Sequence, residues 1–281
     1  MNKILTALIC FLCIFSYSQN QRFIYEYRFV SDSISKDQAK NEIMYLDIVK
    51  KGSKFYSREK AIADSIKIDR INKKIQNFSG INFDFVPFVV EKAYPSYKIL
   101  FFNSLEMDKY KVTDDRIQNW KILPVKEKIG EFNSQKATLD FAGRQWTAWF
   151  VTEIPVQDGP YKFHGLPGLI VKIEDQTKSH SFILKGIKKL NAEYDWASEG
   201  ERKEIGPLVA VNTDQYRKQF IENRNNPVKG IRQMVSSNRK IIMMDENGKK
   251  IDAEQAIRDQ EKRAKAENAK NNNIIEIDLL K

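Results

Sequence analysis

The sequence predicts a mainly β protein, an antiparallel meander that forms a curved or bowl-like sheet, with a few helices and a charged C-terminal helix. Apolar side chains recur at every second position, first at Phe23, Tyr25, Tyr27 and Phe29, which is typical of a strand with one buried face. Later segments of this kind are short and end at Gly, Pro, Asn or Asp, as in antiparallel sheets. Aromatic residues make up 11% of the chain, enough for a substantial core.

The elements follow from changes in the period of the apolar pattern along the chain. Strands are expected at residues 23–30, 43–49, 54–57, 85–92, 97–102, 117–123, 136–141 and 181–190. Helices are expected at residues 59–72, at 213–224 with a cap at Asn212 or Thr213, and at 252–269. Residues 274–279 alternate again and are compatible with a last strand.

Residues 1–18 have the three parts of a secretory signal peptide. Lys3 gives a positive start, residues 4–15 are apolar, and small residues precede Gln19, so the mature chain is expected to begin there. The apolar run is shorter than the roughly 20 residues of a membrane-spanning helix. The two cysteines, Cys10 and Cys13, lie inside the apolar run, so the mature chain has none. A lipid anchor on Cys10 is disfavoured because the apolar run continues beyond it. The expected organisation is a signal peptide at 1–18, one β-rich domain at 19–244 and a charged helical tail at 245–281.

The strongest local signal is the segment that ends in Gly165, Leu166, Pro167, Gly168, Leu169 and Ile170. Three prolines and three glycines lie between residues 155 and 168, which fixes the backbone of the loop. Pro167 and Gly168 have the sequence of a type II turn. We expect residues 146–153 to pair antiparallel with residues 169–174 across this loop, and Leu166 and Leu169 to anchor it in the core.

This segment closely resembles the GLPGLI family of Gram-negative cell-envelope proteins, which is named after the hexapeptide. Gln135-Lys136-Ala137, Gly143-Arg144, Ala148-Trp149 and residues 159–163 match the same pattern in the same order. Ser134 stands where many relatives carry a cysteine, so a disulfide found in those relatives would be absent here.

The resemblance implies a location and an architecture without implying a reaction. The family has no established activity, many members are encoded beside TonB-dependent outer-membrane transporters, and some resemble the bowl-like, non-catalytic N-terminal domain of certain peptide N-glycosidases. It therefore implies an exported protein, periplasmic, associated with the outer membrane or secreted, with a transporter or another envelope protein as partner.

The chain carries 47 Lys and Arg against 37 Asp and Glu, a net charge of +10. This charge favours an anionic glycan or lipopolysaccharide as ligand, although interspersed lysines also simply solvate a surface. Export disfavours nucleic acid as a partner.

The residue types exclude several kinds of chemistry. With two histidines and no cysteine in the mature chain, thiol catalysis and zinc sites built on several Cys or His are excluded, and we expect no metal or cofactor. His180 is expected at the surface. Of Trp146 and Trp149, one is expected in the core and the other exposed or half-exposed.

The leading hypothesis is a non-catalytic binding protein whose working surface is the loop, through Asp158, Tyr161, Lys162 and His164. A rigid loop loses little entropy on binding. The alternatives are a purely architectural loop, and a secreted hydrolase that acts on glycans or peptides with paired carboxylates such as Glu153 and Asp158. Whether the protein is an enzyme stays open, with the non-catalytic hypothesis favoured.

Overall fold

The computed structural model describes residues 20–75, 80–81, 86–202, 206–237, 243–244 and 250–281. The predicted signal peptide, the expected start at Gln19 and the predicted boundary at residue 245 lie outside these residues. Within them, every helix is too short or too polar to cross a membrane.

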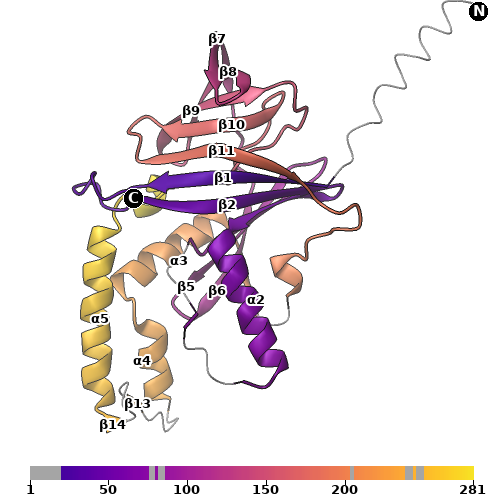
Figure 1. The fold of residues 1–281 in the computed structure, drawn as a ribbon. Coiled ribbons are helices and arrows are strands. Elements are labelled where there is room, and N and C mark those ends of the chain that lie inside the picture. Colours follow the sequence, from indigo (N-terminus) through magenta and orange to yellow (C-terminus); the bar gives the residue numbers. More distant parts are fainter. Residues whose placement is uncertain (1–19, 76–79, 82–85, 203–205, 238–242, 245–249) are drawn as a thin grey trace, which may run out of the picture.

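Twelve of the described strands form one mixed sheet, in the order β12-β6-β5-β4-β3-β2-β1-β11-β10-β9-β8-β7. Two meanders, β1 to β6 and β7 to β11, join where β1 pairs antiparallel with β11. The first six strands are β1 (Gln21–Phe29), β2 (Lys40–Val49), β3 (Gly52–Ser57), β4 (Val89–Ala93), β5 (Lys98–Leu105) and β6 (Asp108–Asp114). The other six are β7 (Lys121–Ile129), β8 (Phe132–Phe141), β9 (Arg144–Val151), β10 (Leu169–Asp175), β11 (His180–Lys189) and β12 (Val209–Asn212). Strand direction turns markedly between β11 and β6, so the sheet is curved (Figure 1).

The mainly β prediction and the antiparallel meander are confirmed, with two differences. Strand β12 pairs parallel with β6, and neither of these two strands was predicted. The strand expected at 117–123 lies instead at Lys121–Ile129. The side chains of Gln118 and Trp120, which precede it, donate hydrogen bonds to loop carbonyls. The expected pairing of residues 146–153 with 169–174 is confirmed, since β9 and β10 are antiparallel.

The two faces of the sheet have different roles. On the core face, Leu46, Phe55 and Val90 pack into one apolar cluster and are fully buried. Because side chains alternate along a strand, the neighbouring residues Asp47, Lys54 and Glu91 project from the opposite face, called the outer face below.

Three of the four described α-helices lie where the sequence predicts a helix. They are α2 (Arg58–Asn72), α3 (Thr213–Asn225), α4 (Lys229–Ser236) and α5 (Ala253–Lys270), and α4 was not predicted. Asn212 caps α3 in a capping box with Gln215, as expected for this residue type. Helix α5 runs beside α4 away from the sheet (Figure 1). Strands β13 (Met243–Met244) and β14 (Lys250–Ile251) form a separate pair.

Residues 274–279 do not form the strand that their alternation suggested. The carbonyl oxygens of Ile274 and Ile275 accept hydrogen bonds from the Arg144 guanidinium instead of from a strand. Residues Ile277–Leu280 form the 3-10 helix η4. The carboxylate of Glu276, 2% exposed, lies in a buried ion cluster described below. Side-chain partners have therefore replaced strand pairing here.

Candidate functional site: a buried loop and a charged cleft

The loop of residues 155–168 lies on the core face of the sheet and is packed there. Phe163 is fully buried and meets the ring of Trp146 edge to face, with ring centroids 4.8 Å apart. Tyr161 is 1% exposed and packs against Phe88 and Phe101. The loop therefore fills the inside of the curved sheet.

The hexapeptide makes this return into the sheet possible. Leu166, Leu169 and Ile170 are buried, which confirms the predicted anchoring in the core. The expected type II turn is not formed: the Gly168 N–H donates to the Leu166 carbonyl, a three-residue turn, and the Leu169 N–H donates to Ile154. A Cβ on Gly168 would lie 2.0 Å from the Val151 carbonyl oxygen. Close approach of two backbones, rather than turn type, requires glycine here.

The loop side chains that were predicted to form a binding surface are not exposed. Asp158 is 0% exposed, Tyr161 1% and Lys162 2%, and only His164 is half-buried. The rigid loop was expected to display these side chains, but Asp158, Tyr161 and Lys162 point into the core, where each has a polar partner.

Asp158 is paired with a buried lysine of the sheet. The Lys92 ammonium lies 2.5 Å from an Asp158 carboxylate oxygen, and both side chains are fully buried. The same ammonium donates to the carbonyl oxygens of Gly159, Tyr161 and Phe163, and Tyr94 donates to Asp158. One cation on β4 thus holds both a loop carboxylate and the loop backbone.

Lys162 extends the buried network to the C-terminal segment. Its ammonium lies 2.8 Å from a carboxylate oxygen of Asp114 and 2.5 Å from one of Glu276. The Tyr161 hydroxyl donates to Glu276 over 2.6 Å. Burial would raise the pKa of Glu276, but Lys162 and Arg116 outweigh it and lower that pKa. The loop therefore connects β4, β6 and the C-terminal segment.

The two histidines are held in neutral form. The His164 ring stacks on Tyr97 with centroids 5.0 Å apart, and burial together with the nearby Lys92 lowers its pKa to about 4. His180 is not at the surface as expected: it is 2% exposed and lies within hydrogen-bonding distance of the Tyr27 hydroxyl and the Asn273 carbonyl. Burial and Arg144 lower the pKa of His180 to about 4. Both environments disfavour the protonated ring.

The structure also bears on two further expectations, the exposure of the two tryptophans of β9 and the pairing of two loop carboxylates. Trp146 and Trp149 are both buried, 0% and 6% exposed, because Trp149 finds a carboxylate partner for its indole N–H in Glu127. The suggested carboxylate pair is not displayed in a common cleft, since Glu153 is exposed while Asp158 is buried and ion-paired.

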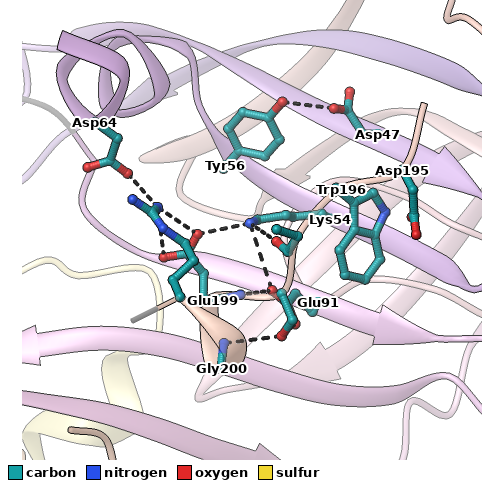
Figure 2. A network of polar contacts seen from close by, with 12 residues as sticks. Asp47, Lys54, Tyr56, Asp64, Glu91, Asp195, Trp196, Glu199 and Gly200 are labelled. Atoms are coloured by element: carbon teal, nitrogen blue, oxygen red, sulfur yellow. Dashed lines mark hydrogen bonds and ion pairs between the residues drawn. The ribbon is translucent and has the colours of Figure 1, made fainter. Parts of the chain in front are cut away.

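An open cleft lies on the outer face of the sheet, on the opposite side from the loop. It has a volume of about 500 Å³, within the range of small-molecule sites. Lys54, Tyr56 and Val89 form its floor, α2 forms one wall, and residues 194–202 form the other. Figure 2 shows the polar groups that gather there from these three segments.

The crossing segment 194–202 is fixed to the sheet at several points. The Tyr194 hydroxyl donates to the buried Asp47 carboxylate, which also accepts from Tyr56 and from Arg22. Ser198 donates to Glu91, and the Glu199 N–H donates to the same carboxylate over 2.7 Å. These contacts fix the second wall of the cleft, whose only regular element among the described residues is the short 3-10 helix η2 (Glu199–Glu201).

Ion pairs cross the cleft between its walls. The Arg202 guanidinium lies 2.8 Å from an Asp64 oxygen on α2 and 3.1 Å from a Glu199 oxygen. Lys54 on the floor lies 2.9 Å from Glu199, and Lys60 on α2 lies 2.6 Å from Asp64. Three cations and the acids Asp64, Asp195 and Glu199 line the cleft, so its charges are balanced.

The protonation states of these acids limit the chemistry of the cleft. Burial opposes ionisation of Glu199, but Lys54 and Lys60 outweigh it and lower the pKa of Glu199. Burial of Asp64 is likewise outweighed by Lys60 and Arg202, which lower its pKa. Burial raises the pKa of Glu91, but Glu91 is 4% exposed and does not line the cleft. Asp64 and Glu199 are therefore ionised at neutral pH and suited to accepting hydrogen bonds.

No group of three or more His, Cys, Asp or Glu residues able to hold a metal ion occurs in the described part of the chain. The sequence hypothesis missed the cleft because its residues come from three distant segments. The available signal was the pair Tyr194 and Trp196, two aromatic residues in a segment that is otherwise polar and without a regular period.

Comparison with known proteins adds a short family match. Residues 140–172 match the family model described as "Protein of unknown function (Porph_ging)", a segment that includes β9, the loop and the first part of β10. No curated protein matches the sequence.

Two solved structures of PNGF-II, in space groups P21 and C2, are similar at 16% sequence identity, with TM-scores of 0.47 and 0.46. Each match covers 72% of this chain and 33% or 32% of the solved one. The match therefore spans about a third of the length of those chains.

Proposed function

We propose that this protein is a non-catalytic binding protein of the cell envelope, accessory to a TonB-dependent outer-membrane transport system, with the outer-face cleft as its binding site. The observation that carries the proposal is the contrast between two surfaces. Of the loop side chains suggested by the sequence, Asp158, Tyr161 and Lys162 are buried and His164 is half-buried, whereas the cleft is open and lined by polar and aromatic groups from three segments.

Two features of the sequence support the envelope setting. Residues 1–18 have the pattern of a signal peptide. The hexapeptide and the motifs around it resemble the GLPGLI family, and residues 140–172 match a family model of unknown function. The link to an outer-membrane transporter rests on that resemblance.

The chemistry of the cleft supports binding rather than catalysis. Acid–base hydrolysis by two carboxylates requires one of them to carry a proton at working pH. The cleft-lining acids Asp64 and Glu199 share the guanidinium of Arg202 and have lowered pKa values. Both are thus acceptors only. The hydrolase alternative gains no support from this arrangement.

The experiment is affinity capture from an envelope extract with the mature protein and two tryptophan variants of α2. Ser65 is exposed and lines the cleft, so Ser65→Trp fills the space without disturbing the core. Ile66 is 37% exposed on the same helix and does not line the cleft, which makes Ile66→Trp the matched control. We expect Ser65→Trp to lose the captured partner while Ile66→Trp keeps it. Equal capture by both variants, with circular dichroism unchanged, would exclude the cleft as the binding site.

A further inference from the structure

We infer that the outer-face cleft takes an uncharged, hydroxyl-rich ligand, a short neutral oligosaccharide. The inference rests on the proposed function, since it names the ligand class for the same site. It is carried by the charge balance of the cleft, by the hydrogen-bonding groups that its walls present, and by a buried indole N–H.

The charge balance disfavours a strongly charged ligand in the cleft. The cations Lys54, Lys60 and Arg202 are each within 3.0 Å of an acid of the same cleft. An anionic ligand would have to compete with Asp64 and Glu199 for these cations and leave a carboxylate unpaired, which is costly in a partly buried site. A cationic ligand would likewise have to compete with these cations for Asp64 and Glu199 and would leave a cation unpaired. An uncharged ligand leaves every ion pair in place.

The lining offers both donors and acceptors to such a ligand. The hydrogen bonds to Asp64 from described residues both reach Oδ2; among the described residues none donates to Oδ1, an oxygen that can accept from a ligand hydroxyl. A carboxylate has about four acceptor positions and a serine hydroxyl both donates and accepts, and the exposed Ser65 lies one residue from Asp64. Hydroxyl groups, which also donate and accept, match this mixture.

The remaining lining is apolar or aromatic, from Ala61, Ile68, Val89, Tyr56 and Trp196. Aromatic side chains with a polar end suit ligands that have both C–H surfaces and polar groups. A sugar ring combines these two kinds of surface.

The indole of Trp196 gives an independent observation. Trp196 is 8% exposed, and its Nε1–H has no hydrogen-bond partner among the described residues. Figure 2 shows this nitrogen on the Asp195 side of the ring, and Asp195 also lines the cleft. A buried unpaired donor is unfavourable by about 1–3 kcal/mol and calls for a partner. A ligand hydroxyl placed there could accept from the indole and donate to the carboxylate.

Lysines that lie near the cleft without lining it make charged probes a necessary part of the test. Lys67 and Lys109 do not line the cleft, but their charges and that of Arg202 lie close enough together to lower the pKa of Lys109, after the larger effect of burial. This excess positive charge is the feature that would favour an acidic glycan instead.

The test uses the mature protein and an array of immobilised oligosaccharides of glucose, mannose and N-acetylglucosamine, with matched members that carry uronate or sulfate groups. We expect binding to at least one uncharged member. Its Kd should change less than twofold between 50 and 500 mM NaCl, because an uncharged ligand makes no charge–charge attraction for salt to screen. Ser65→Trp should weaken that binding at least tenfold, and Ile66→Trp should leave it within twofold.

The outcomes separate the ligand class from the proposed function. Binding only to uronate or sulfate members, or a tenfold loss of affinity in high salt, overturns the inference of an uncharged ligand. Absence of binding to every member also overturns it, while an envelope partner that is lost with Ser65→Trp would still support the cleft as the binding site. Glycan binding that Ser65→Trp does not weaken contradicts the placement of the ligand.

Discussion

A methyl group added at Gly168 should destabilise the fold far more than the same group at Gly165, although both glycines belong to one hexapeptide. At Gly168 a Cβ would lie 2.0 Å from the Val151 carbonyl oxygen and 2.6 Å from its carbon. Both contacts are with backbone, so strand β9 would have to move. At Gly165, where φ is +92°, nothing lies within 4 Å of the added Cβ.

The magnitudes follow from these two environments. Gly165→Ala incurs only the cost of a left-handed backbone, about 1–2 kcal/mol. Gly168→Ala adds a clash inside a packed core, which typically costs about 1–3 kcal/mol more. For a domain of this size about 2–4 °C of melting temperature corresponds to each kcal/mol. Gly168→Ala should therefore melt about 2–12 °C below Gly165→Ala.

The assay is thermal unfolding followed by circular dichroism, with urea unfolding at 25 °C to obtain the free energy directly. Both variants should keep the wild-type far-ultraviolet spectrum below their transitions. Equal stability of the two variants, or a less stable Gly165→Ala, would refute the close approach of β9 to the start of β10 and with it our explanation of the hexapeptide.

Three further measurements test the buried networks. Leu169→Ala, at a fully buried position, should lower the free energy of unfolding by about 2–5 kcal/mol in urea titrations. Lys92→Met should lower it by about 3–5 kcal/mol, because Asp158 would stay buried without its cation, whereas Lys121→Met, at an exposed position, should change it by less than about 0.5 kcal/mol. The pKa values of His164 and His180 fall from 6.5 to about 4 on folding, so the unfolded state binds more protons in this window. Stability should decrease as pH falls from about 6.5 to about 4, by on the order of 3 kcal/mol per histidine; imidazole titrations near 6.5 in the folded protein would contradict this.

Local patterns in the sequence predicted most of the strands and three helices. The alternation of Phe23 and Tyr25 reflects a strand with one buried face, and both residues are fully buried in the structure. Asn212 marked the start of α3 because a side-chain cap is a local interaction. Strand β6 carried a similar signal in Tyr110 and Val112, which lysines on the other face obscured.

The burial of charged loop residues could not be predicted in the same way. Lys162 is buried because Asp114 and Glu276 reach it, and these residues are 48 and 114 positions away along the chain. Lysine is almost never buried without such partners, so composition favours exposure. The same reasoning placed His180 at the surface, although the Asn273 carbonyl that holds it lies 93 residues away.

The contrast between loop and cleft has a physical origin in the open sheet. A sheet of twelve strands whose two edge strands do not pair needs something to cover its inner face, and here the chain supplies its own loop. Filling that face requires glycines where backbones meet, rings such as Phe163 in the core, and a buried cation, Lys92, to satisfy the carbonyls that the loop carries inside. Such demands fix residue types at many consecutive positions and so produce a strong local motif. A cleft between a helix and the segment 194–202 needs only a few side chains from each, such as Ser65 and Trp196. The strongest motif of this chain therefore marks its internal support, while the proposed binding cleft leaves only a weak trace in the sequence.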